Sequence, residues 1–285
     1  MGEPMCRNLV GSGHHHVVVH DRRPEPVSAL VEAGAVDGGS VAATVGGADP
    51  NPHSLPGGPA LEDDLAGADG VLSALEPGKL VVVHSTAPVA LTRELAARCR
   101  DRGAGWCDAP IARTRQAAID GTLSILVGGE RGDVERIAPV LRTMASDVTR
   151  CGGVGSGQVT KLLNNMILFQ NVRAIAEAHA IATGLDRLDD GGLDLDIETL
   201  FEVIAGASGG SFALRNHGRR SILPDEYPEL AFSVAYARKD LRYAMELADE
   251  TGVDAVGART VGELLARAEE AGLGQLYFPV LRRLL

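Results

Sequence analysis

CGGVGSGQVTKLLNN, residues 151–165, marks the change between the two kinds of structure that the chain predicts. Its glycine-rich beginning leads directly into a helical pattern that carries Lys161 and Asn165. Side chains four residues apart lie on one face of a helix, so this amine and this amide can meet one small polar group. The pair is our leading catalytic candidate.

The sequence after this stretch predicts helices alone. Apolar residues recur at helical spacing through residues 158–183, and we expect one helix there, ended by Gly184. About 26 residues at 1.5 Å each give ~39 Å, enough for the spine of a second domain. Further helices are expected over residues 197–205, 212–222, 233–250 and 259–271, each bounded by Gly, Pro or Ser.

Alternating strands and helices are predicted before this stretch. Short apolar strands separated by helices form a doubly wound sheet, which binds ligands at the carboxyl ends of its strands. Asp21, Ser85, Thr86 and Asp108 stand at such ends. The expected strands cover residues 17–19, 79–84, 105–108 and 124–127, and the expected helices cover residues 4–10, 26–33, 60–75, 89–102 and 133–144.

Residues 37–59 carry few signals of regular structure, because they are dense in glycine and proline. Another sheet strand is due near residues 49–55, but Pro50 and Pro52 have no N–H group to donate to a sheet. We expect this strand to be absent or shortened to an edge.

The composition excludes several classes of partner. A formal net charge of −11 disfavours nucleic acid and anionic membranes, and no apolar run approaches the ~20 residues of a membrane span. The N-terminus has no basic segment followed by an apolar one, so we expect a cytoplasmic protein. Four widely spaced cysteines predict reduced thiols. His14, His15 and His16 lead into a strand and point to alternate faces, so no metal site is expected.

Six segments, in this order and spacing, resemble the β-hydroxyacid dehydrogenase family, which includes 3-hydroxyisobutyrate dehydrogenases. The resemblance covers nearly the whole chain. It implies an N-terminal Rossmann domain (residues 1–153) that binds NAD or NADP, an all-helical domain (residues 154–285), and an active site between them. The segments are MGEPMCRNL, DRRP, HSTAP, DAPIARTRQAAIDGTLSILVGG, GGVGSGQVTKLLNN and ARKDLRYAMELA.

The resemblance makes Lys161 the general acid/base that exchanges the proton of the substrate hydroxyl during hydride transfer. Lysine suits this role because burial disfavours its charge and moves its pKa towards the working pH. Asn165 would orient the substrate or Lys161. Asn164 points about 100° away on the helix and is interpreted as structural.

The segment Ala112-Arg113-Thr114 corresponds to the family's substrate-binding loop, where the commoner text is Ser-Gly-Gly. A guanidinium in place of a small hydroxyl-bearing loop suggests a small anionic substrate held by a bidentate fork. The variant is similar to the form in sulfolactaldehyde reductases, which implies a sulfonate or a second acidic group on the substrate.

The resemblance also implies a set of cofactor-binding residues. Asp21 stands where a carboxylate binds the ribose 2′-OH and repels a 2′-phosphate, which favours NAD. Arg22 or Arg23 would reverse this preference by pairing with the phosphate of NADP. The full set is Met1, Gly2, Asp21, Arg22, Leu55, Pro56, Ser85, Thr86 and Lys239.

The chain departs from the family at its beginning, where the first strand and the first two glycines of GxGxxG are absent. We expect a hole between the second and fourth strands of the sheet, and a coding sequence that begins further upstream. Two alternatives therefore stay open: a non-catalytic or impaired relative without a complete cofactor site, and an imine reductase-like enzyme, disfavoured by the retained Lys161. The family also implies a homodimer or homotetramer.

Overall fold

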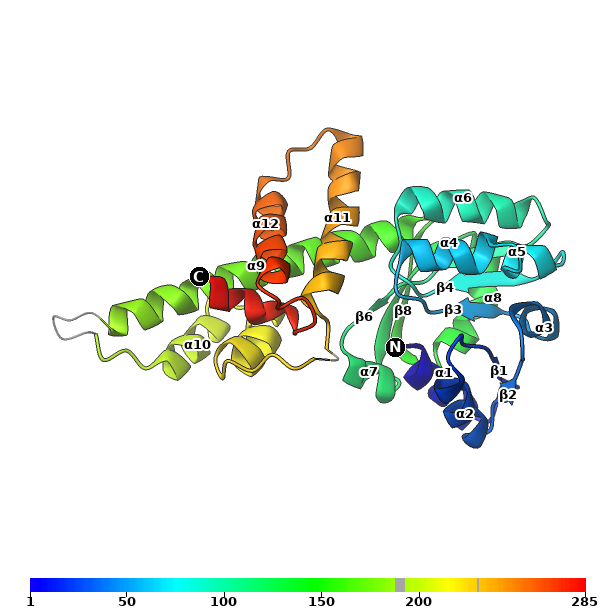
Figure 1. Ribbon diagram of the computed structural model, residues 1–285, viewed down its shortest axis with the longest axis horizontal. Coiled ribbons are helices and arrows are strands. Elements are labelled where there is room, and N and C mark those ends of the chain that lie inside the picture. Colours follow the sequence, from blue (N-terminus) through cyan, green and yellow to red (C-terminus); the bar gives the residue numbers. More distant parts are fainter. Residues whose placement is uncertain (188–192, 230) are drawn as a thin grey trace. The chain divides into compact units, whose positions relative to one another are not determined.

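The computed structural model describes residues 1–187, 193–229 and 231–285. Its contacts divide the chain into two compact units, Met1–Lys161 and Leu162–Leu285. The division falls inside helix α9 (Ser156–Asp186), the long green helix of Figure 1. The boundary expected after residue 153 lies before this helix, and the two units are described separately below.

The first unit contains a mixed sheet in the strand order β3-β4-β5-β7-β6, with β8 paired to β7. Strands β3, β4 and β5 run parallel, whereas β7 runs antiparallel to β5 and β6 and parallel to β8. The strands are β3 (Asn51–His53), β4 (Leu80–Val83), β5 (Gly105–Asp108), β6 (Ile111–Ala112), β7 (Leu123–Gly129) and β8 (Ala145–Gly152).

Helices cover both faces of this sheet, as a doubly wound fold requires. Successive residues of β4 point to opposite faces, so Leu80 and Val82 join one core while Val81 and Val83 join the other. All four are fully buried. The first core includes side chains of α1 (Gly2–Gly11) and α8 (Arg131–Leu141), and the second includes those of α4 (Gly58–Ala66), α5 (Val71–Ala74) and α6 (Val89–Arg100).

Strands β1 (Val18–Val19) and β2 (Val36–Asp37) form a separate two-stranded parallel sheet, with α2 (Pro24–Glu32) between them. Within the described residues, no strand pairing joins this small sheet to β3. The expected hole between the second and fourth Rossmann strands is therefore confirmed. The shortened edge strand is confirmed too, because β3 has three residues and pairs only with β4.

Several elements differ from the sequence predictions. The single helix expected over residues 60–75 is two helices, α4 and α5, separated by a turn. A Cβ atom at Gly67 would lie 2.4 Å from Asp63 O, and one at Gly70 would lie 2.7 Å from Asp64 O, so the turn needs glycine to close on α4. β2, β6, β8, α3 (Val41–Gly47) and α7 (Arg115–Ile119) were not predicted.

The second unit, where described, is built from helices. They are the main part of α9, α10 (Ile197–Gly206), the π-helix η1 (Leu214–Ile222), α11 (Val234–Thr251), α12 (Val256–Glu270) and the 3-10 helix η2 (Phe278–Leu284). The four predicted helices after α9 are confirmed. Gly184 as the end of the long helix is wrong, since α9 continues to Asp186.

One core joins the helices of the second unit. Phe169, Val172 and Ala176 of α9 pack with Phe201 of α10 and with apolar side chains of α11, α12 and η2. Local signals fix α11: the Ser233 hydroxyl accepts a hydrogen bond from the backbone N–H of Tyr236, and Gly252 ends the helix at a φ of 70°. α9 is therefore buried along one face, and the core leaves its other face uncovered.

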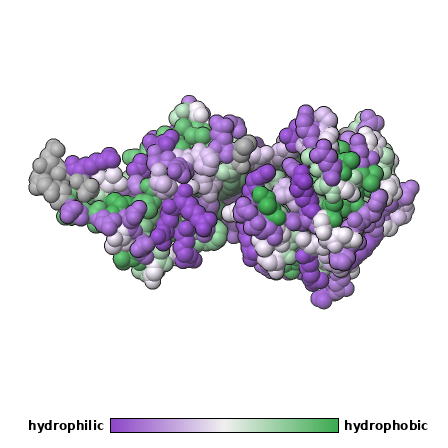
Figure 2. Space-filling model, turned by 90° about the horizontal axis from the view of Figure 1, so that it is seen from below, coloured by the Kyte–Doolittle hydropathy of each residue, from purple (hydrophilic) through white to green (hydrophobic). Residues whose placement is uncertain are grey.

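The face of the molecule shown in Figure 2 is mostly hydrophilic, with hydrophobic patches between the hydrophilic residues. In the described part of the chain, none of the helices combines the length and the apolar character that a bilayer span demands.

Candidate active site

Asp108, at the carboxyl end of β5, anchors the beginning of α9. Its carboxylate is fully buried, and its two oxygens accept hydrogen bonds from the backbone N–H groups of Gly155 (2.7 Å) and Gln158 (3.0 Å). Burial raises the pKa of Asp108, and these N–H groups oppose the rise. The carboxylate thus binds the donors that a helix leaves unpaired at its N-terminus.

Gln158 ties the same helix turn to the end of β4. This fully buried side chain donates from Nε2 to Ser85 O (2.7 Å) and accepts at Oε1 from the N–H of Ala87 (3.2 Å). The Ser85 hydroxyl accepts in turn from the N–H of Leu55 (2.7 Å). The first turn of α9 is therefore linked to the loops that contain Asp108, Ser85 and Leu55, which are expected around the cofactor and the substrate.

The glycines before Lys161 allow this close approach. Gly155 has a φ of +90°, which strongly favours glycine. A Cβ atom at Gly157 would lie 2.5 Å from Leu126 O and 2.8 Å from Asp108 O. Since no larger residue fits against the sheet here, the glycine-rich segment sets where α9 begins, and hence where Lys161 lies.

Lys161 lies in the second turn of α9, at the end of the first unit, and Asn165 lies one helical turn later, in the second. Asn165 is buried and its Nδ2 donates to Asp240 Oδ2 of α11 (2.8 Å). The other oxygen of Asp240 pairs with Lys239 Nζ at 2.7 Å. Asp240 is also buried, so one carboxylate orients both the amide and the amine.

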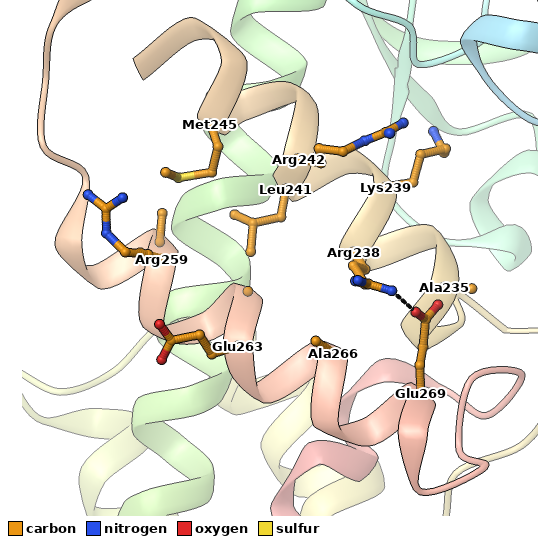
Figure 3. Close-up of a pocket in the computed structure, with 12 residues that line it drawn as sticks. Ala235, Arg238, Lys239, Leu241, Arg242, Met245, Arg259, Glu263, Ala266 and Glu269 are labelled. Carbon is orange, nitrogen blue, oxygen red and sulfur yellow. Dashed lines mark hydrogen bonds and ion pairs between the residues drawn. The ribbon is translucent and has the colours of Figure 1, made fainter. Parts of the chain in front are cut away.

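Lys239 is held by aromatic rings as well as by Asp240. Its Nζ lies 5.0 Å from the centre of the Tyr243 ring and 5.8 Å from that of Tyr236, within the range of cation–π attraction. Lys239 borders an open groove between α11 and α12 (Figure 3). Arg238 and Glu269 form an ion pair between the two helices. The groove has an apolar floor and a mainly cationic rim.

Arg113 follows β6 and folds back onto its own unit. Its Nη1 donates to Thr122 O (2.6 Å) and to the Ser146 hydroxyl (2.7 Å), and its φ of 81° is left-handed. Ala112 ends β6, and the Thr114 hydroxyl caps α7 by accepting from Ala117 N. The left-handed backbone explains why glycine is commoner at this family position. Binding of an anion by Arg113 stays a prediction.

The residues expected around the cofactor lie in the first unit, except for Lys239, which lies in the second. Gly2 begins α1 beside Ser54, since a Cβ atom on Gly2 would lie 3.3 Å from Ser54 Cβ. The N-terminus of α1 therefore adjoins the loop of Leu55 and Pro56, and no side chain caps it. A helix N-terminus is the kind of site that binds a pyrophosphate, and cofactor binding at this position stays a prediction. Ser85 and Thr86 follow β4, where the nicotinamide is expected.

Asp21 and Arg22 follow β1, on the side expected for the adenine ribose. Asp21 Oδ1 accepts from the N–H of Arg23 (2.8 Å), which shapes the turn into α2. The Arg22 guanidinium forms an ion pair with Asp63 of α4. The ion pair directs Arg22 towards α4, and binding of the ribose by Asp21 stays a prediction.

His84 adds no proton-transfer group to this region. Its Nδ1 lies 2.8 Å from Ala109 O, and because a carbonyl only accepts, Nδ1 carries the hydrogen. Burial lowers the pKa of His84 to about 4. A neutral, hydrogen-bonded imidazole supports the loop after β5 and leaves acid/base chemistry to other side chains.

The sequence predicted Asp108 at a strand end that binds ligands and placed Asp240 inside a recognised segment, but it predicted neither as a support of α9, and it passed over Gln158. An acidic residue at a strand end that precedes a glycine-rich helix start is a signal for an anchor of the Asp108 kind. For Gln158 and Asp240 the role depends on partners more than seventy residues away in sequence, at Ser85 and Asn165. Only the folded chain shows those pairings.

Comparisons with known proteins identify the family. The NAD-binding domain of 6-phosphogluconate dehydrogenase matches residues 1–153, and the NAD-binding domain of NADP-dependent 3-hydroxyisobutyrate dehydrogenase matches residues 155–279. A probable 3-hydroxyisobutyrate dehydrogenase of Mycobacterium bovis is 34% identical over 265 residues, covering 90% of this chain and 84% of the relative. The 3-sulfolactaldehyde reductase of Escherichia coli is 30% identical and covers 96% and 89%.

A solved structure agrees with these sequence matches. The 3-hydroxyisobutyrate dehydrogenase of Mycobacterium tuberculosis, solved with L-serine, superimposes with a TM-score of 0.87 at 31% identity. The match covers 100% of this chain and 95% of that one. The chain belongs to the β-hydroxyacid dehydrogenase family and is an NAD(P)-dependent hydroxyacid oxidoreductase.

Proposed function

We propose that the protein interconverts a small 3-hydroxy acid and its semialdehyde, with Lys161 as the general acid/base. The observation that carries this proposal is that hydrogen bonds fix α9 both before and after Lys161. Asp108 and Gln158 fix the turn of α9 that precedes Lys161, and Asp240 fixes Asn165 one turn later. Catalysis needs such preorganised groups, because small misplacements lose much of the rate.

The chain's own residues handle the proton. NAD(P), when bound, accepts or supplies the hydride. Lys161 in its neutral form removes the proton of the substrate hydroxyl as the alcohol is oxidised, and in its ammonium form returns a proton to the aldehyde oxygen in reduction. Asn165 turns its NH₂ group towards the Asp240 carboxylate, so its amide orientation is set before substrate arrives.

The substrate is proposed to be a small anion. The family relation to a sulfolactaldehyde reductase supports a sulfonate or a second acidic group as one option and a carboxylate as the other. Arg113 would bind this group with Nε and Nη2, while Nη1 keeps its bonds to Thr122 and Ser146. Ala112 and Thr114 would complete the binding loop.

NAD is the proposed preference over NADP. Asp21 at the end of β1 favours an unphosphorylated ribose, and the ion pair of Arg22 with Asp63 draws this guanidinium away from a 2′-phosphate. We further propose that the protein works in the cytoplasm and as a homodimer or homotetramer. The acidic net charge, which disfavours anionic membranes as partners, supports the cytoplasmic assignment.

Steady-state turnover with both cofactors tests the proposal. The panel contains 3-hydroxy carboxylates, their sulfonate counterparts, 3-hydroxy dicarboxylates and, as a control class, cyclic imines with NADH or NADPH. We expect oxidation of at least one 3-hydroxy acid and a higher kcat/KM with NAD. Reduction of imines without oxidation of any hydroxy acid would contradict the proposal and support the imine reductase alternative.

A further inference from the structure

Arg22 and Arg23 lie near the expected ribose position, and a carboxylate of the first unit engages each of them. Arg23 Nε lies 3.5 Å from Asp21 Oδ1, and the Arg22 guanidinium forms an ion pair with Asp63. Asp21 and Arg23 share the turn after β1, whereas Asp63 lies in α4. Asp63 therefore acts on Arg22 from outside the segment that the family resemblance assigns to cofactor choice.

Packing fixes α4, and with it the position of Asp63. Leu61 and Leu65, one helical turn apart, are fully buried in the same core of the first unit. The neighbouring acid, Asp64, is held by His53 of β3 through a contact of 2.9 Å between Oδ2 and Nδ1. Asp63 is exposed on the outer side of the helix, where it meets the loop after β1.

Negative charge predominates around Arg22. Its pKa is raised, mainly by the hydrogen bond to Asp63 and further by the charge of Asp64. With Asp21 in the same turn, three carboxylates lie near two guanidinium groups. A 2′-phosphate carries roughly two negative charges at neutral pH, so it has to displace a carboxylate before it gains a guanidinium partner. An unphosphorylated ribose displaces nothing, and this difference favours NAD.

The exposure of the ion pair sets the size of this effect. The side chains of Arg22 and Asp63 are 73% and 61% exposed, and an exposed ion pair shifts an equilibrium by roughly fivefold at most. Direct repulsion between Asp63 and a 2′-phosphate adds to the shift, and dissolved salt screens it. The pair therefore biases the choice of cofactor without excluding NADP.

We propose that Asp63 is a specificity-determining residue, which favours NAD over NADP by occupying the guanidinium that a 2′-phosphate needs. Asp63 is a positioning residue, because it acts through Arg22. The inference rests on the proposed NAD preference and adds the residue that controls it. An ion pair that only stabilised the fold would change the affinities for NADH and NADPH by the same factor, since these cofactors differ only in the 2′-phosphate.

Dissociation constants of the full chain for NADH and NADPH, measured by fluorescence, test this role. We expect Asp63→Ala to lower the constant for NADPH about fivefold, because Arg22 becomes available to the phosphate, and to leave that for NADH within about twofold. The matched control is Glu62→Ala, which removes the same charge from an exposed side chain one residue earlier in α4 and should leave both constants within about twofold. Asp63→Glu keeps the charge and should retain the wild-type preference.

The same measurement in the Arg22→Gln background shows whether Asp63 acts through Arg22. Most of the gain in NADPH affinity should disappear there, because no guanidinium is left to release. Thermal unfolding checks that each variant is folded. Unchanged constants in Asp63→Ala, an equal change for both cofactors, an equal gain in Glu62→Ala or a full gain without Arg22 would overturn the proposed role of Asp63. Tighter binding of NADPH than of NADH by the wild type would overturn the NAD preference and this inference, and binding of neither would overturn the proposed function as well.

Discussion

Arg113 combines an unfavourable backbone conformation with two hydrogen bonds. A left-handed φ of 81° costs a non-glycine residue roughly 1–2 kcal/mol, and the bonds to Thr122 O and Ser146 Oγ offset that cost. Arg113 therefore stabilises the loop after β6, and we propose that it also binds the substrate anion. Two substitutions separate these roles.

Arg113→Ala and Arg113→Gly both remove the guanidinium, but only glycine relaxes the backbone. We expect both variants to raise KM for an anionic substrate about tenfold or more, the loss of a charged hydrogen bond. Urea denaturation should show Arg113→Gly more stable than Arg113→Ala by about 1 kcal/mol. An unchanged KM in both variants would limit Arg113 to the structural role.

The anchor of α9 is the central feature at the scale of elements. Asp108 accepts at both carboxylate oxygens, so an amide at this position turns one donor towards a backbone N–H group that also donates. We expect Asp108→Asn to destabilise the fold by about 2–3 kcal/mol, the cost of leaving a buried donor unpaired. It should also lower kcat more than tenfold with little change in cofactor affinity.

Asn8→Ala is a useful control for this prediction, because Asn8 Nδ2 donates a hydrogen bond to a backbone carbonyl of α7, that of Ala118, and not to α9. We expect it to lower stability without lowering kcat. Thermal unfolding and single-turnover rates measured on both variants distinguish the cases. Equal effects on kcat would mean that Asp108 acts through general stability alone.

The π-helix η1 buries a histidine whose titration opposes folding. His217 contacts the Tyr277 hydroxyl through Nδ1 and packs among aromatic rings, and burial lowers its pKa to about 4. Since this value lies below the ordinary 6.5, protonation favours the unfolded chain. The stability that depends on neutral His217 is complete above pH 6.5 and is lost as the pH falls towards 4.

His217→Gln removes this titration and should flatten the pH dependence of unfolding between pH 6.5 and 4. The difference between wild type and variant should change by up to about 3 kcal/mol over that window. Urea denaturation at several pH values measures it. A slope that is the same in both proteins would place His217 in contact with water.

Elements with strong local signals were predictable, whereas those that depend on distant contacts were not. The apolar run of β4 and the Ser233 cap and Gly252 end of α11 identify their elements from sequence alone. β2 has two exposed residues, and its hydrogen bonds to β1 are visible only in the fold. Gly184 was misjudged because a glycine inside a helix costs only about 1 kcal/mol, which does not end α9 there.

For the whole molecule, the start of α9, which carries the candidate Lys161, is well anchored, whereas the expected cofactor side has an open sheet. Strands β1 and β3 flank the position where a Rossmann fold has its first strand, and they are not paired with each other. The sequence predicted this gap from family spacing. Lys161, Asn165 and Lys239 were named as site candidates by resemblance and stay predictions. The contacts that Asp240 and Gln158 make could not be predicted, because they join residues far apart in sequence.

The central claim is that this chain oxidises a hydroxy acid with Lys161 as the group that moves the proton. The direct test measures kcat of Lys161→Ala and Lys161→Arg on the best substrate of the panel, together with NADH affinity by fluorescence. We predict that both variants lose at least about 100-fold in kcat, since removal of a general acid/base costs 10²–10⁴. NADH affinity should stay within about threefold of wild type, which corresponds to less than 1 kcal/mol. Turnover that survives in Lys161→Ala would contradict the account.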